Sequence, residues 1–480
     1  MSMSKKIAWN TFVQVAGKAV STVIGIVVVA AMARYLGKEG FGGYTTIIAY
    51  LQIFGILVDF GLTLMTVQLI SERPDDKKFN DKILSNIFTL RLISAVIFLG
   101  IAPIIAFFFP YPLIVKWGIA LTSISFLFIS LNQLLTGVFQ KNLRMDSIAL
   151  SEVIGRLVLL AGVMLFIFLD KGLIAIMLAV VIGSIINFAV SLFFSRRYTT
   201  IKFAFDWPLW KTTLSRSWPI GISIAFNLIY FKADAVILSV FRSQAEVGVY
   251  GAPYRVLEIL ISFPFMFIGV LMPFFVRYWA QKNEKEFKDL MQTTFDFLAI
   301  VAWPLVVGTL LLATPIMTLV AGSEFQESGR ILQILILATA VIFLGTLLSH
   351  IIVALNKQKK MIIGYIATAI VALVLYLVFI PKYGMYAAAW ITVISESMIA
   401  LLTYLVVYFT IKWRPGLKIS NRALLSALLM GVVVYFVMAY MPSVLISVII
   451  GAISYVGFLY LMRGFQKETI IDIIQLKRKA

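Results

Sequence analysis

Charged residues recur inside long apolar stretches of this chain, where a charge needs a physical reason. The cations of interest are Lys18, Arg91, Arg156, Lys232 and Arg255, and the acids are Asp59, Glu152, Asp234, Glu258 and Glu396. A charge in hydrocarbon costs several kcal/mol, so such a side chain normally faces a protein interior or a water-filled cavity. Cations in a cavity can bind an anionic group, whereas acids there can pair with cations or carry protons.

The spacing of four of these residues predicts local ion pairs. Glu152 and Arg156 are four residues apart, and Arg255 and Glu258 are three apart. Residues at these spacings share one face of a helix and can interact. Each pair therefore has two open interpretations, a structural ion pair or a cation that is held ready for an anionic ligand.

Lys18 has polar neighbours on its own helix face, because Gln14 and Thr22 stand four residues before and after it. This polar stripe predicts that Lys18 faces a cavity and binds an anion there. An internal salt bridge to Asp59 or Asp234 is the alternative. Arg91 also has two interpretations. It is either a cation that faces the cavity or a structural side chain that snorkels to the membrane interface.

Lys232 and Asp234 are two residues apart and therefore point to different faces of their helix, so each is expected to have its own partner. Glu396 has no basic residue three or four positions away. Burial disfavours a charged carboxyl group, so an unpaired acid in the membrane can carry a proton in a coupled cycle. A hydrogen-bonded structural acid is the alternative for Glu396.

The elements that hold these charges are predicted to be membrane-spanning helices. The 480 residues are 61% hydrophobic and only 13% charged, with a mean hydropathy of +0.99. Most of the chain consists of apolar runs of about 20 residues or more, the length that crosses a bilayer as a helix. Barrel strands are shorter and alternate in polarity. We therefore predict an all-α polytopic membrane protein.

Fourteen spans are expected, with both termini in the cytoplasm. The spans are 7–35, 39–70, 83–109, 112–139, 147–169, 173–195, 212–240, 249–277, 291–320, 329–355, 361–381, 385–411, 421–440 and 443–462. Lys and Arg gather in the loops on the side of the termini, which indicates the cytoplasmic face. This loop pattern also explains the net charge of +19 without nucleic acid.

Two sequence matches at nearly the same offset indicate an internal repeat. Phe41–Tyr44 matches Val247–Tyr250 at an offset of 206, and Gly172 matches Gly384 at an offset of 212. Two six-helix lobes that enter the membrane in the same direction would be related by a pseudo-two-fold axis along the membrane normal. The expected divisions are lobes at 1–211 and 212–411, a helix pair at 412–462 and a cytoplasmic tail at 463–480.

Three groups of residues resemble the polysaccharide transport family, which includes O-antigen and other repeat-unit flippases, of the multidrug/oligosaccharidyl-lipid/polysaccharide exporter superfamily. The groups are Asn10 with Ala33–Gly37, Gly40–Tyr44 and Asp59–Gly61; Trp218-Pro219 with Tyr230–Asp234, Val247–Tyr250 and Met272-Pro273; and the glycine- and alanine-rich starts of the sixth and twelfth spans. Their order and spacing, more than any single motif, carry the resemblance.

The resemblance implies a V-shaped helical bundle with a central cavity. It also implies transfer of an undecaprenyl-diphosphate-linked oligosaccharide from the inner to the outer leaflet of a cytoplasmic membrane by alternating access. Lys18, Arg91, Arg156, Arg255 and Lys232 would then receive the diphosphate. The implied partners are this lipid-linked substrate, the bilayer and polysaccharide polymerase machinery.

The sequence indicates no enzyme, because it contains no Walker A, HExxH or nucleophile-elbow motif and no sizeable loop for a catalytic domain. No cofactor is expected. No metal site is expected either, since there is no cysteine and one histidine. Three other functions stay open: a cation-coupled multidrug exporter or a lipid II flippase of the same superfamily, and a non-transporting membrane scaffold.

Overall fold

The computed structural model describes residues 3–73, 76–142 and 144–464, and the regular elements in these residues are helices. The all-α prediction is therefore confirmed. Eleven described segments are long and apolar enough to cross a membrane. The helices are α1 (Met3–Asp59), α2 (Leu62–Glu72), α3 (Lys77–Ala106), α4 (Leu113–Lys141), α5 (Met145–Phe168), α6 (Gly172–Ser195), α7 (Trp207–Phe241), α8 (Gln244–Ala280), α9 (Glu284–Ala321), α10 (Ser328–Ala354), α11 (Gln358–Ile411), α12 (Lys418–Tyr440) and α13 (Val444–Leu461), with a 3₁₀ turn η1 (Ser323–Phe325).

Two of these helices each contain two of the predicted spans. Gly37 interrupts α1 at φ 63°, and Gly384 interrupts α11 at φ 58°. Side chains with a Cβ rarely adopt such positive φ angles, so glycine is the residue that allows a reversal with almost no loop. Each helix therefore has two arms, and the arms contain the predicted spans 7–35, 361–381 and 385–411 and the larger part of 39–70.

The span predicted at 39–70 is present but is not one unbroken helix, because it breaks about two thirds of the way along. α1 ends at Asp59, Phe60 and Gly61 have φ angles of 34° and 82°, and α2 begins at Leu62. Backbone that leaves the helix at membrane depth is tolerated only where protein or a water-filled cavity satisfies its polar groups. The break thus marks a place where polar side chains must gather.

The chain divides into two compact units. The first comprises the residues up to Gly251 together with Ile380–Gly384, and the second comprises Ala252–Phe379 with the residues from Met385 onward. The predicted division into lobes at 1–211 and 212–411 follows the sequence repeat instead and stays a prediction. Of the predicted tail at 463–480, residues 465–480 lie outside the described residues, as do the side chains at Asn10, Pro219, Tyr230 and Phe231.

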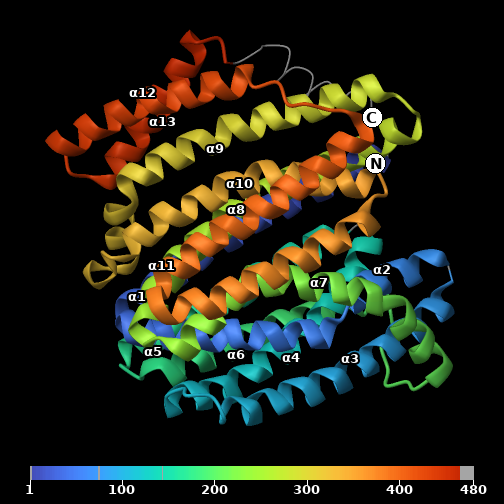
Figure 1. The fold of residues 1–480 in the computed structure, drawn as a ribbon. Helices are drawn as coiled ribbons and strands as arrows, with labels where there is room; N and C mark the ends of the chain where they lie inside the picture. The colour runs from blue at the N-terminus through green and yellow to red at the C-terminus, as the bar shows by residue number, and fades with distance from the viewer. Residues whose placement is uncertain (1–2, 74–75, 143, 465–480) are drawn as a thin grey trace. The chain divides into compact units, whose positions relative to one another are not determined.

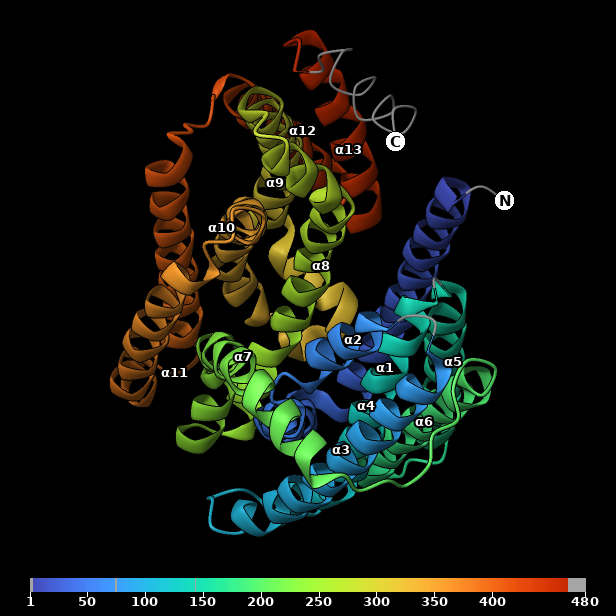
Figure 2. The same cartoon turned by 90° about the vertical axis from the view of Figure 1, so that its right-hand side faces the viewer.

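The first unit is built around α1, which packs against α3, α4, α5, α6 and α7. α4 and α6 pack closely together, and so do α5 and α6 (Figure 2). Small residues permit some of these contacts. A Cβ on Gly155 of α5 would lie 2.7 Å from the Asn187 Cβ on α6, and the Gly183 backbone is also close. Such small-residue contacts are typical of helix packing in membranes.

The connection between α6 and α7 lies along α3 as an ordered extended segment. Asp81, Ser85 and Thr89 stand four residues apart on one face of α3 and accept hydrogen bonds from alternate backbone N–H groups between residues 200 and 204, at 3.0–3.1 Å. Asp206 then caps α7 by accepting from the Leu209 N–H at 3.1 Å. Four residues of a helix and two residues of an extended chain advance by similar lengths, so every fourth side chain of α3 reaches every second residue of the connection. This match fixes where α7 begins.

The beginnings of the second arm of α1 and of α8 cross at backbone contact. A Cβ on Gly42 would collide with the Gln244 carbonyl oxygen, and a Cβ on Gly248 would collide with the Lys38 carbonyl oxygen. Both pairs are related by the offset of 206 residues, since 42 + 206 is 248 and 38 + 206 is 244. Reciprocal contacts between equivalent residues are what a two-fold relation between the two motifs requires. The second repeat agrees, because Gly172 and Gly384 both have positive φ, at 71° and 58°.

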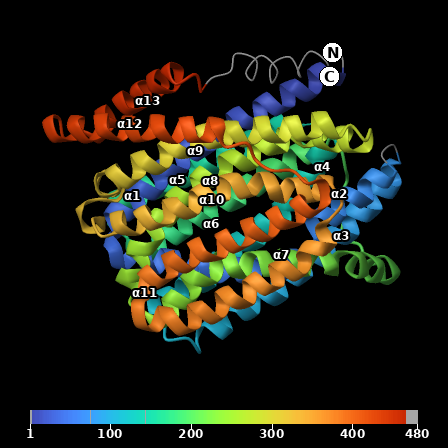
Figure 3. The ribbon, with the colours of Figure 1, turned by 45° about the horizontal axis from the view of Figure 1, so that its top comes forward.

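In the second unit, α9 packs against α10, α12 and α13 (Figures 1 and 3). Phe275, Phe287 and Phe343 are almost fully buried in its largest described apolar cluster. The last helix pair is held to α9 partly by Tyr455, whose hydroxyl donates to the Ile300 carbonyl oxygen at 2.7 Å. A buried tyrosine needs such a partner for its polar end.

We predict that Gly42→Ala destabilises the fold strongly, because the new methyl group has backbone rather than a flexible side chain as its neighbour. Overpacking of this kind typically costs about 1–3 kcal/mol. Gly100→Ala on α3 is the matched control, since nothing lies within 4 Å of a Cβ at that position. Thermal unfolding of both purified variants in detergent measures the difference. Equal melting temperatures for the two variants would contradict the crossing.

Candidate functional site

Lys18 and Glu152 come together between the first arm of α1 and α5, and Arg156 lies one turn further along α5. The Lys18 ammonium donates to the Glu152 carboxylate at 3.0 Å, and the two side chains are 44% and 26% exposed. Arg156 is exposed, and its guanidinium lies 3.9 Å from the position of a Cβ on Gly25 of α1. Among the described residues no acid pairs with Arg156. The cluster therefore holds two cations and one anion, with a net charge of +1.

The packing of the first arm of α1 against α5 explains why these three charged residues lie on the same side of the helix pair. Gly17 of α1 lies against Ala149 of α5, and Gly25 lies near Arg156, so the two helices run parallel over about 12 Å. Lys18 therefore lies level with the turn of α5 that carries Glu152. The predicted alternatives for Lys18, a bridge to Asp59 or Asp234, do not occur. The proposed pairing of Glu152 with its own helix neighbour is replaced by this contact between helices.

Arg91 and Asp59 form a second group at the break in the second span. The Arg91 guanidinium is fully buried and pairs with the Asp59 carboxylate. It also donates to the Thr63 hydroxyl at 2.8 Å and to the Ser130 carbonyl oxygen at 2.9 Å. The same carboxylate accepts from the Thr63 backbone N–H at 3.2 Å and from the Thr63 hydroxyl. With this many partners and no exposed surface, Arg91 is not available to a ligand in this conformation.

The break is closed from the other side by α7. A Cβ on Gly221 would lie 2.7 Å from the Phe60 carbonyl oxygen, so the α7 backbone lies directly against the exposed end of α1. A larger residue at position 221 would push the two segments apart. Asp59 therefore accepts from a backbone N–H in the first turn of α2 and is the counterion of Arg91, while Gly221 provides the close approach that the broken span requires.

Asp234 and Lys232 are both buried on α7. The Asp234 carboxylate accepts a hydrogen bond from the Tyr250 hydroxyl of α8 and another from the Ala235 backbone N–H at 2.7 Å. Tyr250 is itself fully buried and belongs to the repeated motif. Asp234 thus fastens the end of α7 to the start of α8, close to the crossing of Gly42 and Gly248.

Arg255 and Glu258 lie in the second unit and pair on α8, as their spacing predicts. The Arg255 guanidinium donates to the Glu258 carboxylate at 2.8 Å, and the side chains are 21% and 24% exposed. Both remain partly accessible. A guanidinium engages phosphate oxygens bidentately, so Arg255 can serve a phosphate only if it shares or exchanges its carboxylate partner.

Glu396 is a buried acid on the second arm of α11, with 8% exposure. No hydrogen-bond donor among the described residues reaches its carboxylate. Burial without a partner disfavours the charged form, as the absence of a basic neighbour in the sequence already indicated. Glu396 therefore differs from Asp59, Glu152, Asp234 and Glu258, each of which has a hydrogen-bond or ion-pair partner.

Sequence reasoning missed several neutral polar pairs in the first unit. Ser125 of α4 hydrogen-bonds Ser184 of α6 at 2.6 Å, and Asn132 donates to Asn187 at 3.5 Å on the same two helices. The two pairs share one face of each helix, because Ser125 and Asn132 are seven residues apart on α4 and Ser184 and Asn187 are three apart on α6. Single serines and asparagines in apolar runs carry no sequence signal of a partner 55 or more residues away.

We predict that the Arg91–Asp59 pair is a structural requirement. Arg91→Leu alone leaves a partly buried carboxylate without its cation and is expected to cost about 3–5 kcal/mol. The double variant with Asp59→Leu removes both charges and should be more stable than the single variant. The control is Arg216→Leu, which loses only an exposed pair with Glu72, 3.3 Å long and worth about 1 kcal/mol or less. Thermal unfolding of the purified proteins decides, and additive losses in the double variant would count against coupling.

We predict that Glu396→Gln keeps or raises the melting temperature. The substitution is nearly isosteric and removes a group whose charged form is penalised by burial without a partner. Glu258→Gln is the matched control, since it removes one member of an ion pair. A loss of several degrees in the Glu396 variant alone would show that the carboxylate has a partner that stabilises it.

Comparison with known proteins shows which family the chain resembles. The polysaccharide biosynthesis protein family matches residues 7–279, which is more than half of the chain, and the MatE family matches residues 219–379. A Shigella flexneri protein named as an O-antigen transporter is 24% identical over 430 residues, covering 84% of this chain and 98% of that protein. A Haloferax volcanii protein named as a low-salt glycan biosynthesis flippase is 24% identical over 458 residues, covering 92% and 93%.

Solved structures share the fold. The lipid II flippase MurJ in an inward closed conformation has a TM-score of 0.78 at 18% identity, covering 94% of this chain and 99% of that one. An inward-facing multidrug resistance MATE transporter has a TM-score of 0.69 at 14% identity, covering 84% and 98%. The family match over residues 7–279 shows that the chain belongs to the polysaccharide biosynthesis protein family.

Proposed function

We propose that this protein is a flippase that moves an undecaprenyl-diphosphate-linked oligosaccharide repeat unit across the cytoplasmic membrane. Family membership and the relatives named as O-antigen transporter and glycan flippase support the class of cargo. The observation that carries the proposal is the cluster of Lys18, Glu152 and Arg156, because its net positive charge lies within an apolar helical unit. A diphosphate is the part of such a cargo that needs a cation inside the membrane.

The cluster suits an anion that must be bound and then released. Lys18 is a compact point charge that already shares a carboxylate, and Arg156 presents planar donors that fit phosphate oxygens. When a diphosphate arrives, Lys18 can exchange Glu152 for a phosphate oxygen, and Glu152 takes the ammonium back when the cargo leaves. A fully unpaired set of cations would bind the diphosphate more tightly but would also hold it longer.

Cationic drugs, the cargo expected for a multidrug exporter, fit this cluster poorly. Two cations with one acid repel a positively charged ligand, whereas an acid that lacks a nearby cation would attract it. A membrane scaffold without transport has no need for half-exposed charges between apolar helices. The charge of the cluster therefore favours an anionic cargo over both alternatives.

Orientation and mechanism complete the proposal. The basic loops on the side of the termini favour a cytoplasmic location for both ends. Repeats that enter the membrane in the same direction favour alternating access by two lobes. Glu396 is the best candidate for a coupling acid, because Asp59, Glu152, Asp234 and Glu258 are engaged in the contacts described above.

We predict that Lys18→Ala and Arg255→Ala each reduce transport by about 10- to 100-fold, because a charge-assisted hydrogen bond is worth about 1.5–3 kcal/mol. The rate is measured as restored surface polymer in a strain that lacks the gene. Arg197→Ala, which removes an exposed cation in the α6–α7 connection, should retain normal transport. Full activity of both Lys18→Ala and Arg255→Ala, at normal membrane levels, would remove the cationic site.

The cargo itself is identified in the deletion strain. Lipid-linked saccharides are extracted, and their leaflet is determined by accessibility to a membrane-impermeant reagent. We expect a single repeat unit to accumulate on the cytoplasmic side while surface polymer is lost. Accumulation of lipid II instead would assign the protein to peptidoglycan synthesis, and unchanged lipid-linked sugars would overturn the flippase proposal.

A further inference from the structure

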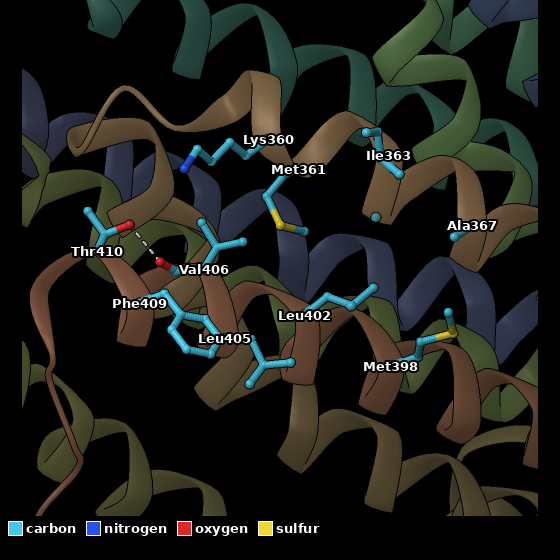
Figure 4. Close-up of a pocket in the computed structure, with 11 residues that line it drawn as sticks. Lys360, Met361, Ile363, Ala367, Met398, Leu402, Leu405, Val406, Phe409 and Thr410 are labelled. Carbon is cyan, nitrogen blue, oxygen red and sulfur yellow. Dashed lines mark hydrogen bonds between the residues drawn. The ribbon is translucent and has the colours of Figure 1, made fainter.

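An apolar groove lies between the two arms of α11 in the second unit. It has a cavity volume of about 470 Å³, within the range of about 300–1,000 Å³ that small-molecule sites occupy. Figure 4 shows Ala367 and Lys360 on the first arm facing Met398, Leu402 and the end of the second arm. The groove belongs to none of the charge clusters described above.

The lining of the groove favours a hydrocarbon chain. Its side chains are almost all aliphatic, methionine or aromatic, and the Thr410 hydroxyl is satisfied by the Val406 carbonyl oxygen at 2.7 Å. Lys360 is the one charged residue of the lining. Ile363 and Phe409 are 75% and 67% exposed, so the groove has an open apolar rim. In a bilayer such a surface is covered by lipid tails.

Basic residues gather at the Lys360 end of the groove. Lys357 and Lys359 precede the first arm or lie in its first turn, and Lys412 and Arg414 follow the second arm. The Lys412 ammonium lies 5.4 Å from the centre of the Phe409 ring, which lines the groove. No acid occurs in residues 357–367 or 409–418. The positive charge at this end is therefore not compensated locally in the sequence.

The length of the groove matches one leaflet. Its lining on the second arm extends from Met398 to Thr410, which is about 18 Å at a rise of about 1.5 Å per residue. Half of the hydrocarbon thickness of a bilayer is about 15 Å. An acyl chain anchored by its headgroup at Lys360 would therefore reach about as deep as the leaflet does, and a chain that crosses the bilayer would run past the end of the groove.

We propose that this groove binds one anionic glycerophospholipid of the surrounding bilayer, with an acyl chain between the arms of α11 and its phosphate at Lys360. Basic pockets between membrane helices recognise anionic headgroups by this combination of charge and apolar contact. Leu402 lies 3.4 Å from the position of a Cβ on Gly364, so the two arms touch there and form part of the groove wall against which the acyl chain lies. The inference does not depend on the proposed cargo, since the occupant is a bilayer lipid.

Lipid retention by the full-length protein tests the proposal. The purified protein is incubated with phosphatidylglycerol or phosphatidylcholine of identical chains, and bound lipid is counted by native mass spectrometry. We expect phosphatidylglycerol to be preferred about fivefold or more, because one cation near the headgroup contributes a factor of about five. Lys360→Ala should abolish most of this preference, and Ala367→Trp should reduce binding of both lipids at least threefold by filling the groove.

Two further variants keep the test independent of folding. Ile363→Glu places a carboxylate three residues after Lys360 at an exposed position and should lower phosphatidylglycerol binding without loss of melting temperature. Lys285→Ala, which removes an exposed cation of the same unit away from the groove, should bind like the wild type. Unchanged lipid preference in both Lys360→Ala and Ile363→Glu would overturn the proposal. Displacement of phosphatidylglycerol by equimolar undecaprenyl phosphate would also overturn it, by assigning the groove to an isoprenoid tail.

Discussion

The backbone crossing of Gly42 and Gly248 is the constraint on which the rest of the first unit depends. Two helices without hydrophobic force between them in lipid associate through close packing, and the closest packing needs glycine on both sides. Because Gly42 and Gly248 are equivalent residues of a repeat, one contact sets the position of both motifs at once. Tyr250 then carries this contact to the hydrogen bond with Asp234, so the crossing also fixes the end of α7.

The break after Asp59 shows how the unit places polar groups inside an apolar structure. A continuous helix would need no buried guanidinium, but Phe60 and Gly61 leave the helix and expose the ends of α1 and α2. Arg91 and Thr63 satisfy the Asp59 carboxylate, and Gly221 brings α7 against the gap. Arg91, which the sequence suggests as a ligand-binding cation, thus stabilises the backbone geometry of the break.

The sequence predicts the helices well and the partners of their charges poorly, for physical reasons. Apolar runs of bilayer length leave only the helix, and glycines such as Gly37 and Gly384 mark where it reverses. Spacing within one helix also predicts the Arg255–Glu258 pair. By contrast, Lys18 pairs with a residue 134 positions away, which no local pattern records. Burial, which separates Arg91 from Lys18, is likewise a property of packing.

A buried charge with several partners stabilises the fold, whereas an exposed charge with few partners is available to a ligand. Arg91 has three hydrogen-bonded partners, of which Asp59 is also its ion-pair partner, and no exposed surface, so a ligand cannot reach it in this conformation. Lys18 is half-exposed with one partner, and Arg156 has none among the described residues. Under the proposed function, a diphosphate would replace the contact of Lys18 with Glu152 and add one at Arg156, and this exchange would make its binding reversible. Lys360 follows the same logic at the bilayer surface, where its anion is a lipid that diffuses in and out.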